Sequence, residues 1–378
     1  MADPIMLKPD LGFVKDIISS GGKSLKKCYQ CATCSVVCNI TSDENPFPRK
    51  EMLWAQWGLK ENFIGNPSVW LCYQCNDCSN YCPRDAKPGE VLGAIRKQTI
   101  KHYSTPSFMT DFVNNWKFIP ILFLLPTILF LIMLWSIGNL KIPDGEIVFS
   151  KFFPVYLIDI MFGFALFFGL TIGTLGIRKF WKDLLQNQDI IKNNFKKTLF
   201  ETVKEILSHD KFKKCDKSKN RFTTHLLVFY GFISAGIATT LALIYLYILK
   251  IESPYPIIGS VKVFGNIGAI LLFTGITFMI IYKIKNAKKL GFGSYFDWLL
   301  IFTIAIITIT GILSEVIRLL NISTLAYTIY FIHLVFVFSL FIYLPYSKLA
   351  HIFYRITALY YAKSSNGNNN QKIKKVLN

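Results

Sequence analysis

The chain has 378 residues, of which 52% are hydrophobic and 15% aromatic, and its formal net charge is +19. This composition is too apolar for an ordinary soluble protein and indicates a membrane protein. In a soluble protein, so large a positive charge would suggest nucleic-acid binding. Here basic loops beside membrane helices explain it, because lysine and arginine are retained on the cytoplasmic side. We therefore expect no nucleic-acid partner.

Residues 1–105 have the composition of a small soluble domain. The first residues lack the apolar stretch of a signal peptide, so we expect this domain to stay on the cytoplasmic side. That compartment is reducing, which favours metal ligation by cysteine over disulfide bonds. Helices are predicted from Arg49 to Leu59 and from Gly89 to Lys101, where Pro88 suits a first helical turn.

Eight of the nine cysteines form two quartets with the spacing C-x2-C-x2-C-x3-C, namely Cys28, Cys31, Cys34, Cys38 and Cys72, Cys75, Cys78, Cys82. In this pattern three cysteines of one loop ligate a [4Fe–4S] cluster, and the fourth reaches the neighbouring cluster. We therefore assign Cys28, Cys31, Cys34 and Cys82 to one cluster, and Cys72, Cys75, Cys78 and Cys38 to the other. Two zinc sites are the alternative, although zinc ribbons usually pair C-x2-C knuckles. Cys215 stands apart, and we expect it to be an incidental thiol.

Six apolar stretches are long enough to cross a hydrocarbon core of ~30 Å as helices of roughly 20 residues. They lie near 117–138, 152–176, 222–249, 261–282, 296–318 and 325–346. The connections at 178–221 and 283–295 and the tail are rich in lysine and arginine, whereas the opposite loops contain only Lys141, Lys151 and Lys250. This asymmetry predicts a multi-pass protein of the cytoplasmic membrane with both termini and the long basic loop inside.

Two further segments have a distinctive composition. The stretch 190–215 alternates apolar and basic residues at near-helical spacing, which is typical of a helix lying in the membrane interface. The tail, 361–378, is rich in asparagine and lysine, and we predict that it is disordered.

Three of the five histidines, His225, His333 and His351, lie in or beside predicted membrane helices. Histidine is costly inside a membrane and is usually functional there, and ligation of haem is its obvious use in a redox protein. We expect His225 and His351 on the same membrane side, where they share one haem, although a structural role stays open for each histidine. His333 precedes His351 by about five helical turns, which places both on one helix face but about 27 Å apart, too far to share that haem.

Two segments resemble the cytochrome b (gamma) subunit of respiratory nitrate reductases. Its last helix, which has two histidines at the same spacing, is similar to His333 and the run Leu344-Pro345-Tyr346-Ser347-Lys348-Leu349-Ala350-His351. Its first haem helix is similar to Arg221-Phe222-Thr223-Thr224-His225 with Tyr230-Gly231-Phe232. The cysteine quartets resemble the iron–sulfur C-type subunit of heterodisulfide reductase. The two halves in this order resemble the membrane subunit of the quinone-interacting membrane-bound oxidoreductase complex of sulfur-metabolising bacteria.

The resemblance implies an all-α fold, with a helical ferredoxin-like two-cluster domain at 1–105 and a six-helix transmembrane cytochrome b bundle at 106–360. It implies electron exchange between menaquinone, haem b, the two [4Fe–4S] clusters and cytoplasmic flavin or iron–sulfur partner subunits, with adenosine-5′-phosphosulfate reductase as the onward partner. One departure concerns the second histidine of the family's first haem helix, because Ala235 stands at that position. We therefore expect one haem b. A second haem at His333 would need another ligand, for which His209 is the remaining candidate despite its expected surface position.

Charged residues in or near the membrane supply further candidates. Asp159, Glu315 and His333 are predicted in the outer half, where they could bind quinol and accept its protons. The absence of an outer haem would favour an inner quinone site near His225 instead. Arg221 and Lys348 are candidate partners for haem propionates, and Asp297 is expected to be a solvated boundary residue.

We therefore expect an electron-transfer subunit of a quinone-linked oxidoreductase complex. A heterodisulfide-reductase-type membrane redox subunit is the alternative within the same class. A membrane-anchored zinc-binding scaffold, or a transporter with a redox-sensing cysteine domain, is the alternative from another class.

Overall fold

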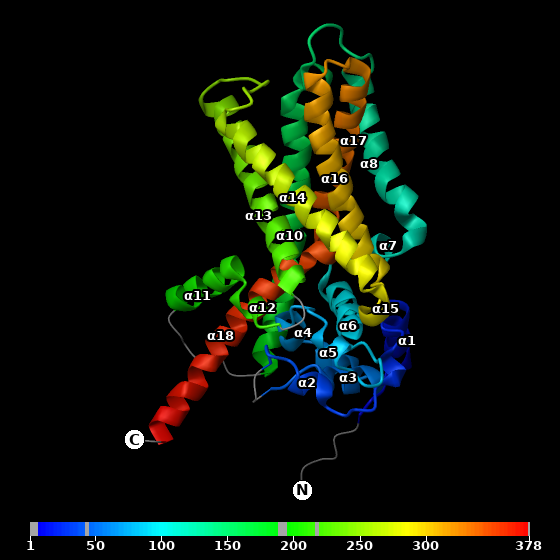
Figure 1. The fold of residues 1–378 in the computed structure, drawn as a ribbon, viewed down its shortest axis with the longest axis vertical. Helices are drawn as coiled ribbons and strands as arrows, with labels where there is room; N and C mark the ends of the chain where they lie inside the picture. The colour runs from blue at the N-terminus through cyan, green and yellow to red at the C-terminus, as the bar shows by residue number, and fades with distance from the viewer. Residues whose placement is uncertain (1–6, 42–44, 188–194, 216–218, 377–378) are drawn as a thin grey trace.

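The computed structural model describes residues 7–41, 45–187, 195–215 and 219–376. Within these ranges every regular element is a helix, and six helices are long and apolar enough to span a membrane. The predicted all-α fold with six candidate membrane helices is therefore confirmed. Figure 1 shows the long helices along the long axis of the molecule, with the N-terminal helices, in blue and cyan, gathered at one end.

Short helices and cysteine loops form the N-terminal part. The longer helices are α1 (Leu11–Ser19), α3 (Arg49–Gln56) and α6 (Pro88–Tyr103), and the short ones are η1 (Leu25–Lys27), α2 (Thr33–Val36), η2 (Lys60–Phe63), α4 (Ser68–Leu71) and α5 (Asp77–Asn80). α3 and α6 confirm the two helices predicted there. Asp10 caps α1, because its carboxylate accepts a hydrogen bond from the Phe13 N–H at 2.9 Å. Inward-facing side chains, including Ile17, Met52 and Ile95, form one buried core.

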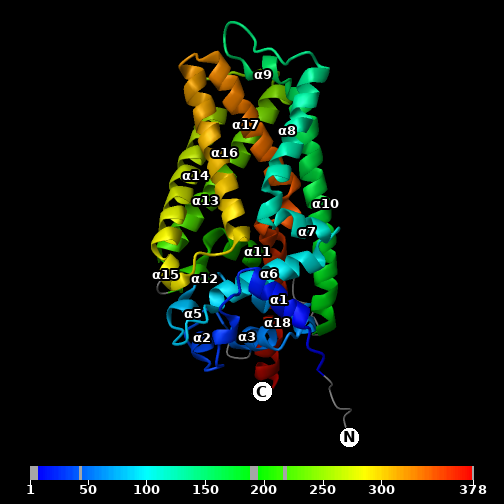
Figure 2. The same ribbon diagram turned by 90° about the vertical axis from the view of Figure 1, so that its right-hand side faces the viewer.

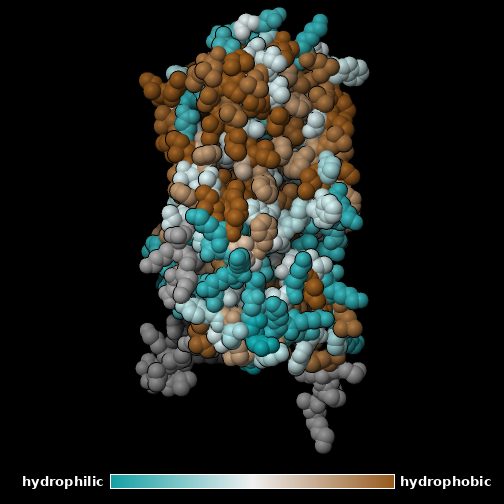
Figure 3. Space-filling model, turned by 45° about the vertical axis from the view of Figure 1, so that its right-hand side comes forward, coloured by the Kyte–Doolittle hydropathy of each residue, from teal (hydrophilic) through white to brown (hydrophobic). Residues whose placement is uncertain are grey.

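The membrane part contains one helix for each predicted span. These helices are α8 (Ile119–Ser136), α10 (Val155–Asn187), α13 (Lys219–Leu243) with its π-helical end η4 (Ile244–Ile248), α14 (Ser260–Lys285), α16 (Tyr295–Leu319) and α17 (Ser323–Ile342). Figure 2 shows α13, α14 and α16 on one side of the bundle and α8 and α10 on the other, with α17 between them. Figure 3 shows a broad hydrophobic band over this half and a hydrophilic surface near the cysteine loops. Such a band is the surface that a lipid bilayer covers.

Glycines allow α13 and α14 to approach closely. A Cβ atom on Gly268 would lie 3.0 Å from the Ala235 nitrogen and 3.1 Å from the Gly231 carbonyl oxygen. A Cβ atom on Gly275 would meet Val228 at 2.9 Å. Small residues at such crossings are typical of membrane helix pairs. The backbone of Ala235, where the resemblance expects a second haem histidine, therefore lies in this close contact between α13 and α14.

Short elements border the bundle. They are α7 (Phe108–Val113), η3 (Trp116–Phe118), α9 (Phe149–Phe152), α11 (Phe195–Ser208), α12 (Asp210–Lys213) and α15 (Ala287–Leu290). α11 buries its polar face, because Thr202 and Glu205 are 1% and 8% exposed, whereas Phe195 and Phe200 are more than half exposed. An outward apolar face supports the predicted position in the membrane interface. The first residues of the predicted interfacial stretch, 190–194, lie outside the described residues.

The chain does not continue as one helix from His333 to His351. α17 ends at Ile342, the 3₁₀ turns η5 (Leu344–Tyr346) and η6 (Lys348–Ala350) follow, and α18 (His351–Val376) then begins. Pro345 lacks the N–H that a continuing helix needs. The expectation that both histidines lie on one helix face is therefore wrong. α18 continues past residue 361 to Val376, and the disorder predicted for the tail at 361–378 stays a prediction.

An aromatic cluster joins the cysteine loops to the membrane part. Trp70 of α4 stacks on Tyr354 of α18 with ring centroids 5.0 Å apart, and it meets Phe180 of α10 edge-on at 6.5 Å. Tyr103, at the end of α6, contacts the same two rings. All four side chains are almost fully buried. The two parts of the chain therefore share a hydrophobic core, which fixes the cysteine loops beside the ends of α10 and α18.

Candidate functional site

Eight cysteines line two small cavities in the N-terminal part. One cavity is lined by Cys28, Cys31, Cys34 and Cys82, and the other by Cys72, Cys75, Cys78 and Cys38. Each cavity therefore combines three cysteines of one loop with the fourth cysteine of the other quartet, which is the crossed grouping expected from the spacing. The crossing occurs because α2 and α5, which precede the two fourth cysteines, pack against each other.

The two cysteine loops share one backbone conformation. In the first loop Gln30 and Ala32 have φ angles of 61° and 68°, and in the second Gln74 and Asn76 have φ angles of 52° and 70°. Left-handed residues in such loops turn N–H groups toward the concave side, where they stabilise negative charge. The Gln74 N–H, for example, donates to Cys72 Sγ at 3.2 Å. This conformation suits a group of thiolate ligands.

Most of these thiols are poor acids without a metal. Burial raises the pKa of Cys34 to about 12 and that of Cys38 to about 11. A bound metal ion supplies the positive charge that deprotonates such thiols. Cys31 differs, because it is exposed and a hydrogen bond with the Thr33 hydroxyl, at 3.4 Å, lowers its pKa. Four sulfur donors per cavity fit a [4Fe–4S] cluster, and the crossed arrangement is that of two-cluster ferredoxins.

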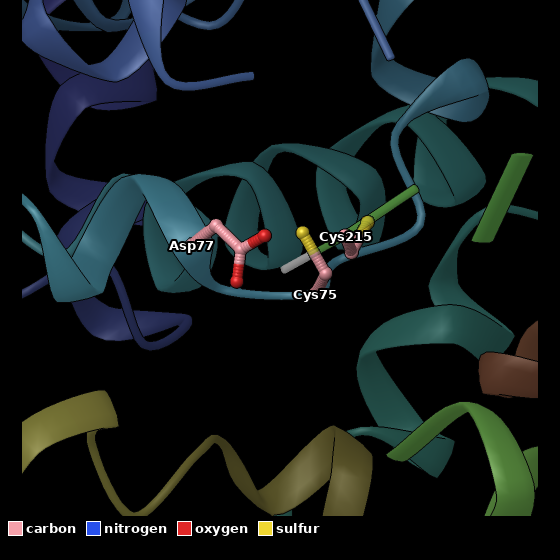
Figure 4. A group of neighbouring side chains, drawn as sticks. All are labelled: Cys75, Asp77 and Cys215. Atoms are coloured by element: carbon pink, nitrogen blue, oxygen red, sulfur yellow. The ribbon is translucent and has the colours of Figure 1, made fainter. Parts of the chain in front are cut away.

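Cys215 also lines the second cysteine cavity. Its Sγ, the Cys75 Sγ and a carboxylate oxygen of Asp77 lie within 4.8 Å of one another, and all three side chains are buried (Figure 4). The expectation of an incidental thiol is therefore wrong. Nothing in the local sequence indicated this position, because it depends on how the loop after α11 folds back onto the cysteine loops.

A larger cavity, of about 340 Å³, lies between the cysteine loops and the membrane helices. His209, His225 and His351 all line it, so the structure brings the predicted haem pair to one cavity. The expected surface position of His209 is wrong, because this residue is 8% exposed and its ring centroid lies 5.0 Å from that of His225. Cys72 lines both this cavity and the second cysteine cavity. The two cavities therefore share a wall.

The three histidines would supply suitable nitrogen donors for the iron of a haem. His351 Nδ1 lies 2.6 Å from the Lys348 carbonyl oxygen, so it acts as the donor and leaves Nε2 for a metal. Nδ1 of His209 and Nδ1 of His225 are buried without a hydrogen-bond partner in the part of the chain that the structure describes. Buried ring nitrogens are normally paired, so these atoms indicate a missing ligand. Burial also lowers the pKa of His351 to about 3, which keeps the imidazole in its neutral, ligating form.

Basic side chains surround the large cavity. They are Arg96, Arg221, Lys283, Lys348 and Arg355. Arg221 and Lys348, the predicted propionate partners, are thus both present. Lys348 forms an ion pair with Asp297, which also pairs with Lys283 at 3.5 Å. The expectation that Asp297 is a solvated boundary residue is wrong, because it is 8% exposed.

Two half-buried arginines that the sequence did not single out connect the large cavity to the second cysteine loop. Arg355 donates to the carbonyl oxygens of Trp70 and Cys72 at 2.8 Å and 3.0 Å, and Arg96 donates to the same Cys72 carbonyl. Arg355 stands one helical turn after His351, a spacing that could have indicated it. Arg96 of α6 stands directly before Lys97 and Gln98, and no such signal distinguishes it. Both cations stand where the two cavities meet.

The two carboxylates predicted for quinone chemistry each have a partner on another helix or turn. Tyr247 donates to Asp159 Oδ2 at 2.5 Å. Glu315 pairs with Arg318 at 3.0 Å, as expected, and also with Lys262 of α14. Neither carboxylate is among the described residues that line the large cavity. The structure therefore does not join these groups to the histidine cavity.

His333 is placed in the contact between α16 and α17. Its Nδ1 lies 3.1 Å from the Thr310 hydroxyl and 3.0 Å from the Ile307 carbonyl oxygen. A Cβ atom on Gly311 would lie 3.0 Å from the His333 ring, so the ring packs directly on that helix. These contacts favour a structural role over haem ligation.

Comparisons with known proteins support the cysteine assignment. Residues 24–86 match the family described as 4Fe-4S dicluster domain. The C-type subunit of the H(2):CoB-CoM heterodisulfide,ferredoxin reductase of Methanothermobacter thermautotrophicus is 33% identical over 93 residues, 24% of this chain and 50% of the relative. A protein of Archaeoglobus profundus that is named as similar to the C-type subunit of heterodisulfide reductase is 31% identical over 100 residues, 26% of this chain and 53% of the relative. The match spans about half the length of these relatives. The predicted likeness of the cysteine domain to this heterodisulfide reductase subunit is therefore confirmed.

The membrane part matches a second family. Citrate utilization protein B of Escherichia coli is 27% identical over 281 residues, which cover 71% of this chain and 73% of the relative. No solved structure matches the chain significantly. The narrower assignment to the quinone-interacting complex stays a prediction. The family described as Citrate utilization protein B matches residues 116–371, more than half of the chain, so this protein belongs to that family.

Proposed function

We propose that this protein is the membrane electron-transfer subunit of a quinone-linked oxidoreductase, connecting menaquinone through haem b and two [4Fe–4S] clusters to cytoplasmic flavin or iron–sulfur partner subunits. The observation that carries this proposal is the wall shared by the two cavities, because Cys72 lines both the histidine cavity and the second cysteine cavity. Electron transfer slows steeply with distance, and a shared wall keeps that distance short.

The large cavity would hold one haem b, which supplies reversible one-electron chemistry. His351 of α18 and His225 of α13, which line the same cavity, are the proposed ligands. His209 is the alternative haem ligand to His225, because the two rings lie next to each other in the cavity. Arg221 has the charge and position to pair with a propionate, and the buried Arg355 Nη2 lacks a hydrogen-bond partner among the described residues.

The first cluster would be the exit toward the soluble partner. Cys31, one of its ligands, is the exposed cysteine of the first cavity. Tyr29 and Val36 beside it are 69% and 81% exposed, and Arg84 stacks over the Tyr29 ring at 4.1 Å. An apolar patch with a cationic rim suits a partner whose own rim is acidic.

Two observations bear on the identity of the partner, and they point to different proteins. The sequence resemblance names adenosine-5′-phosphosulfate reductase as the onward partner. The relatives' names point instead to citrate utilization or to heterodisulfide chemistry. In each case we expect the soluble redox partner to dock over Cys31, the exposed cysteine. Activity with a thiol-linked partner would favour the heterodisulfide-reductase type.

The quinone site and the orientation complete the proposal. Asp159 is the favoured proton-accepting group, because it is partly exposed and accepts a hydrogen bond from a tyrosine, whereas Glu315 is held between two cations. The basic loops support the proposed orientation, with the cysteine domain and both termini in the cytoplasm. The domain limits proposed are 1–105 for the two-cluster domain and 106–360 for the haem b domain.

Cofactor analysis of the purified full-length protein tests the proposal. We expect the iron content of two [4Fe–4S] clusters, one haem b by pyridine haemochrome, and reduction of the haem by a menaquinol analogue. His351→Ala should lose the haem and keep the clusters, and so should His225→Ala combined with His209→Ala. His333→Ala, the matched control, should keep both. A colourless, zinc-loaded protein would instead support the scaffold alternative and refute electron transfer.

A further inference from the structure

Cys215 is the fifth cysteine at a cluster site that needs four. Cys38, Cys72, Cys75 and Cys78 already supply the four sulfur ligands of the second cluster, and Cys215 lines the same cavity. Its sulfur lies within 4.8 Å of Cys75 Sγ, and its side chain is 3% exposed. A buried thiol at this distance from a proposed ligand sulfur is close enough to interact with it.

The chain holds Cys215 from both sides of the second cluster cavity. The Asn39 side chain, next to Cys38, donates to the Lys214 carbonyl oxygen at 2.9 Å. The ring of Phe212 stacks on Tyr73, next to Cys72, with centroids 5.2 Å apart. The Cys215 N–H also donates to the Phe212 carbonyl oxygen at 3.2 Å, which closes the turn. These contacts fix residues 209–215 as a strap across the cavity.

The position of Cys215 distinguishes a hydrogen-bond donor from a ligand. Figure 4 shows its sulfur beside that of Cys75, with Asp77 on the other side of Cys75. The group within 4.8 Å contains Cys75 and Asp77 and does not include the other cysteines of this cavity. The ligand sulfurs of a cubane bind different iron atoms and point away from one another, so a thiol this close to Cys75 Sγ is nearer than a further ligand would be. A thiol beside one ligand sulfur is instead placed to donate an S–H hydrogen bond to it.

Such a donor has a definite electrochemical effect. Reduction of a cluster by one electron increases the negative charge on its sulfur atoms. A hydrogen bond to a ligand sulfur stabilises that charge more in the reduced state than in the oxidised state, so it raises the reduction potential. No proton leaves Cys215 and no bond to it forms in this step.

We propose that Cys215 is a positioning residue of the second cluster, whose thiol donates to the Cys75 sulfur and raises the reduction potential of that cluster above the value it would otherwise have. The proposal rests on the proposed function only insofar as it needs both clusters to be present. A cluster with a raised potential, placed next to the histidine cavity, accepts electrons from that cavity more readily.

Redox titration of the full-length holoprotein, followed by electron paramagnetic resonance, tests this role. Cys215→Ala removes the donor with little change in volume, and Cys215→Ser keeps a donor. We expect both variants to retain the iron content of two clusters. In Cys215→Ala one cluster should shift to a more negative potential, and in Cys215→Ser it should return toward the wild-type value.

The matched control is Thr33→Val, which removes the hydroxyl that contacts Cys31 Sγ at the other cluster. It should shift the other signal, so the two substitutions assign the two clusters independently. Loss of half the iron in Cys215→Ala and Cys215→Ser alike would make Cys215 a ligand and overturn the proposal. Unchanged potentials in Cys215→Ala would also overturn it, as would a zinc ion lost with Cys215. A wild-type protein without iron would instead refute the proposed function itself.

Discussion

Glu51 is a buried carboxylate that makes the stability of the cysteine domain depend on pH. Its side chain, on α3, is 0% exposed. Neither of its oxygens has a hydrogen-bond partner in the described part of the chain, and the nearest cation is Lys50 Nζ at 3.8 Å. Burial raises the pKa of Glu51 from 4.5 to about 7. The folded domain therefore prefers the protonated carboxyl group.

The sign and size of the effect follow from this shift. Because the folded-state pKa is raised, the stability that the protonated group allows is present below pH 4.5 and is lost as the pH rises through 7. A shift from 4.5 to about 7 corresponds to about 3 kcal/mol. Glu51→Gln keeps the shape without the charge. We expect it to raise the free energy of unfolding at pH 8 by up to about 3 kcal/mol, less the lost attraction to Lys50, and to change it little at pH 5.

Hydrogen–deuterium exchange of α3 in the detergent-purified full-length protein gives a local readout, after correction for the intrinsic pH dependence of exchange. Thermal unfolding at the same two pH values gives a global one. Glu61→Gln is the matched control, since Glu61 is an exposed carboxylate in the following turn and its loss should change stability by less than about 0.5 kcal/mol. Equal pH dependence in wild type and Glu51→Gln would refute the assignment of a desolvated carboxylate.

Three further substitutions test the packing that positions the site. Trp70→Ala should destabilise the protein by about 3–5 kcal/mol in thermal or denaturant unfolding, because Trp70 is 1% exposed and joins the cysteine domain to α10 and α18. Gly268→Leu should force α13 and α14 apart and reduce haem content, whereas Gly265→Leu, whose nearest contact is Ala238 Cβ at 3.9 Å, should bind haem normally. His333→Ala should cost about 1–3 kcal/mol of stability while haem content stays at the wild-type level, and a loss of haem would contradict its structural role.

The membrane helices and the grouping of the cysteines could be predicted from the sequence, because both depend on local sequence patterns. Each of the six apolar stretches became a helix, because a run of that length and composition has few other stable states in a membrane. The crossed grouping of the cysteines followed from their spacing, since the fourth cysteine of each quartet stands one turn beyond its loop. The helical spacing of His333 and His351 predicted one continuous helix. The helix instead breaks after Ile342, because Pro345 lacks the N–H that a continuing helix needs.

The site itself depended on contacts between distant segments. His209 and Cys215 belong to a basic loop that looks solvated in isolation, and both became buried because the loop folds across the cysteine domain. Arg355 could be linked to His351 by helical spacing, but its bonds to the Trp70 and Cys72 carbonyl oxygens join segments 285 and 283 residues apart. Single-sequence patterns describe one segment at a time. They do not show which loop covers which cavity.

The strap of residues 209–215 connects the histidine cavity to the second cysteine cavity. Its first residue, His209, lines the histidine cavity, and its last, Cys215, lines the second cluster cavity. Between them Phe212 packs on Tyr73, whose neighbour Cys72 is in the wall that both cavities share. A shift of the strap would therefore disturb both sites together. The segment between the second and third membrane helices thus links the geometry of the histidine cavity to that of the second cysteine cavity, although it contains none of the eight quartet cysteines.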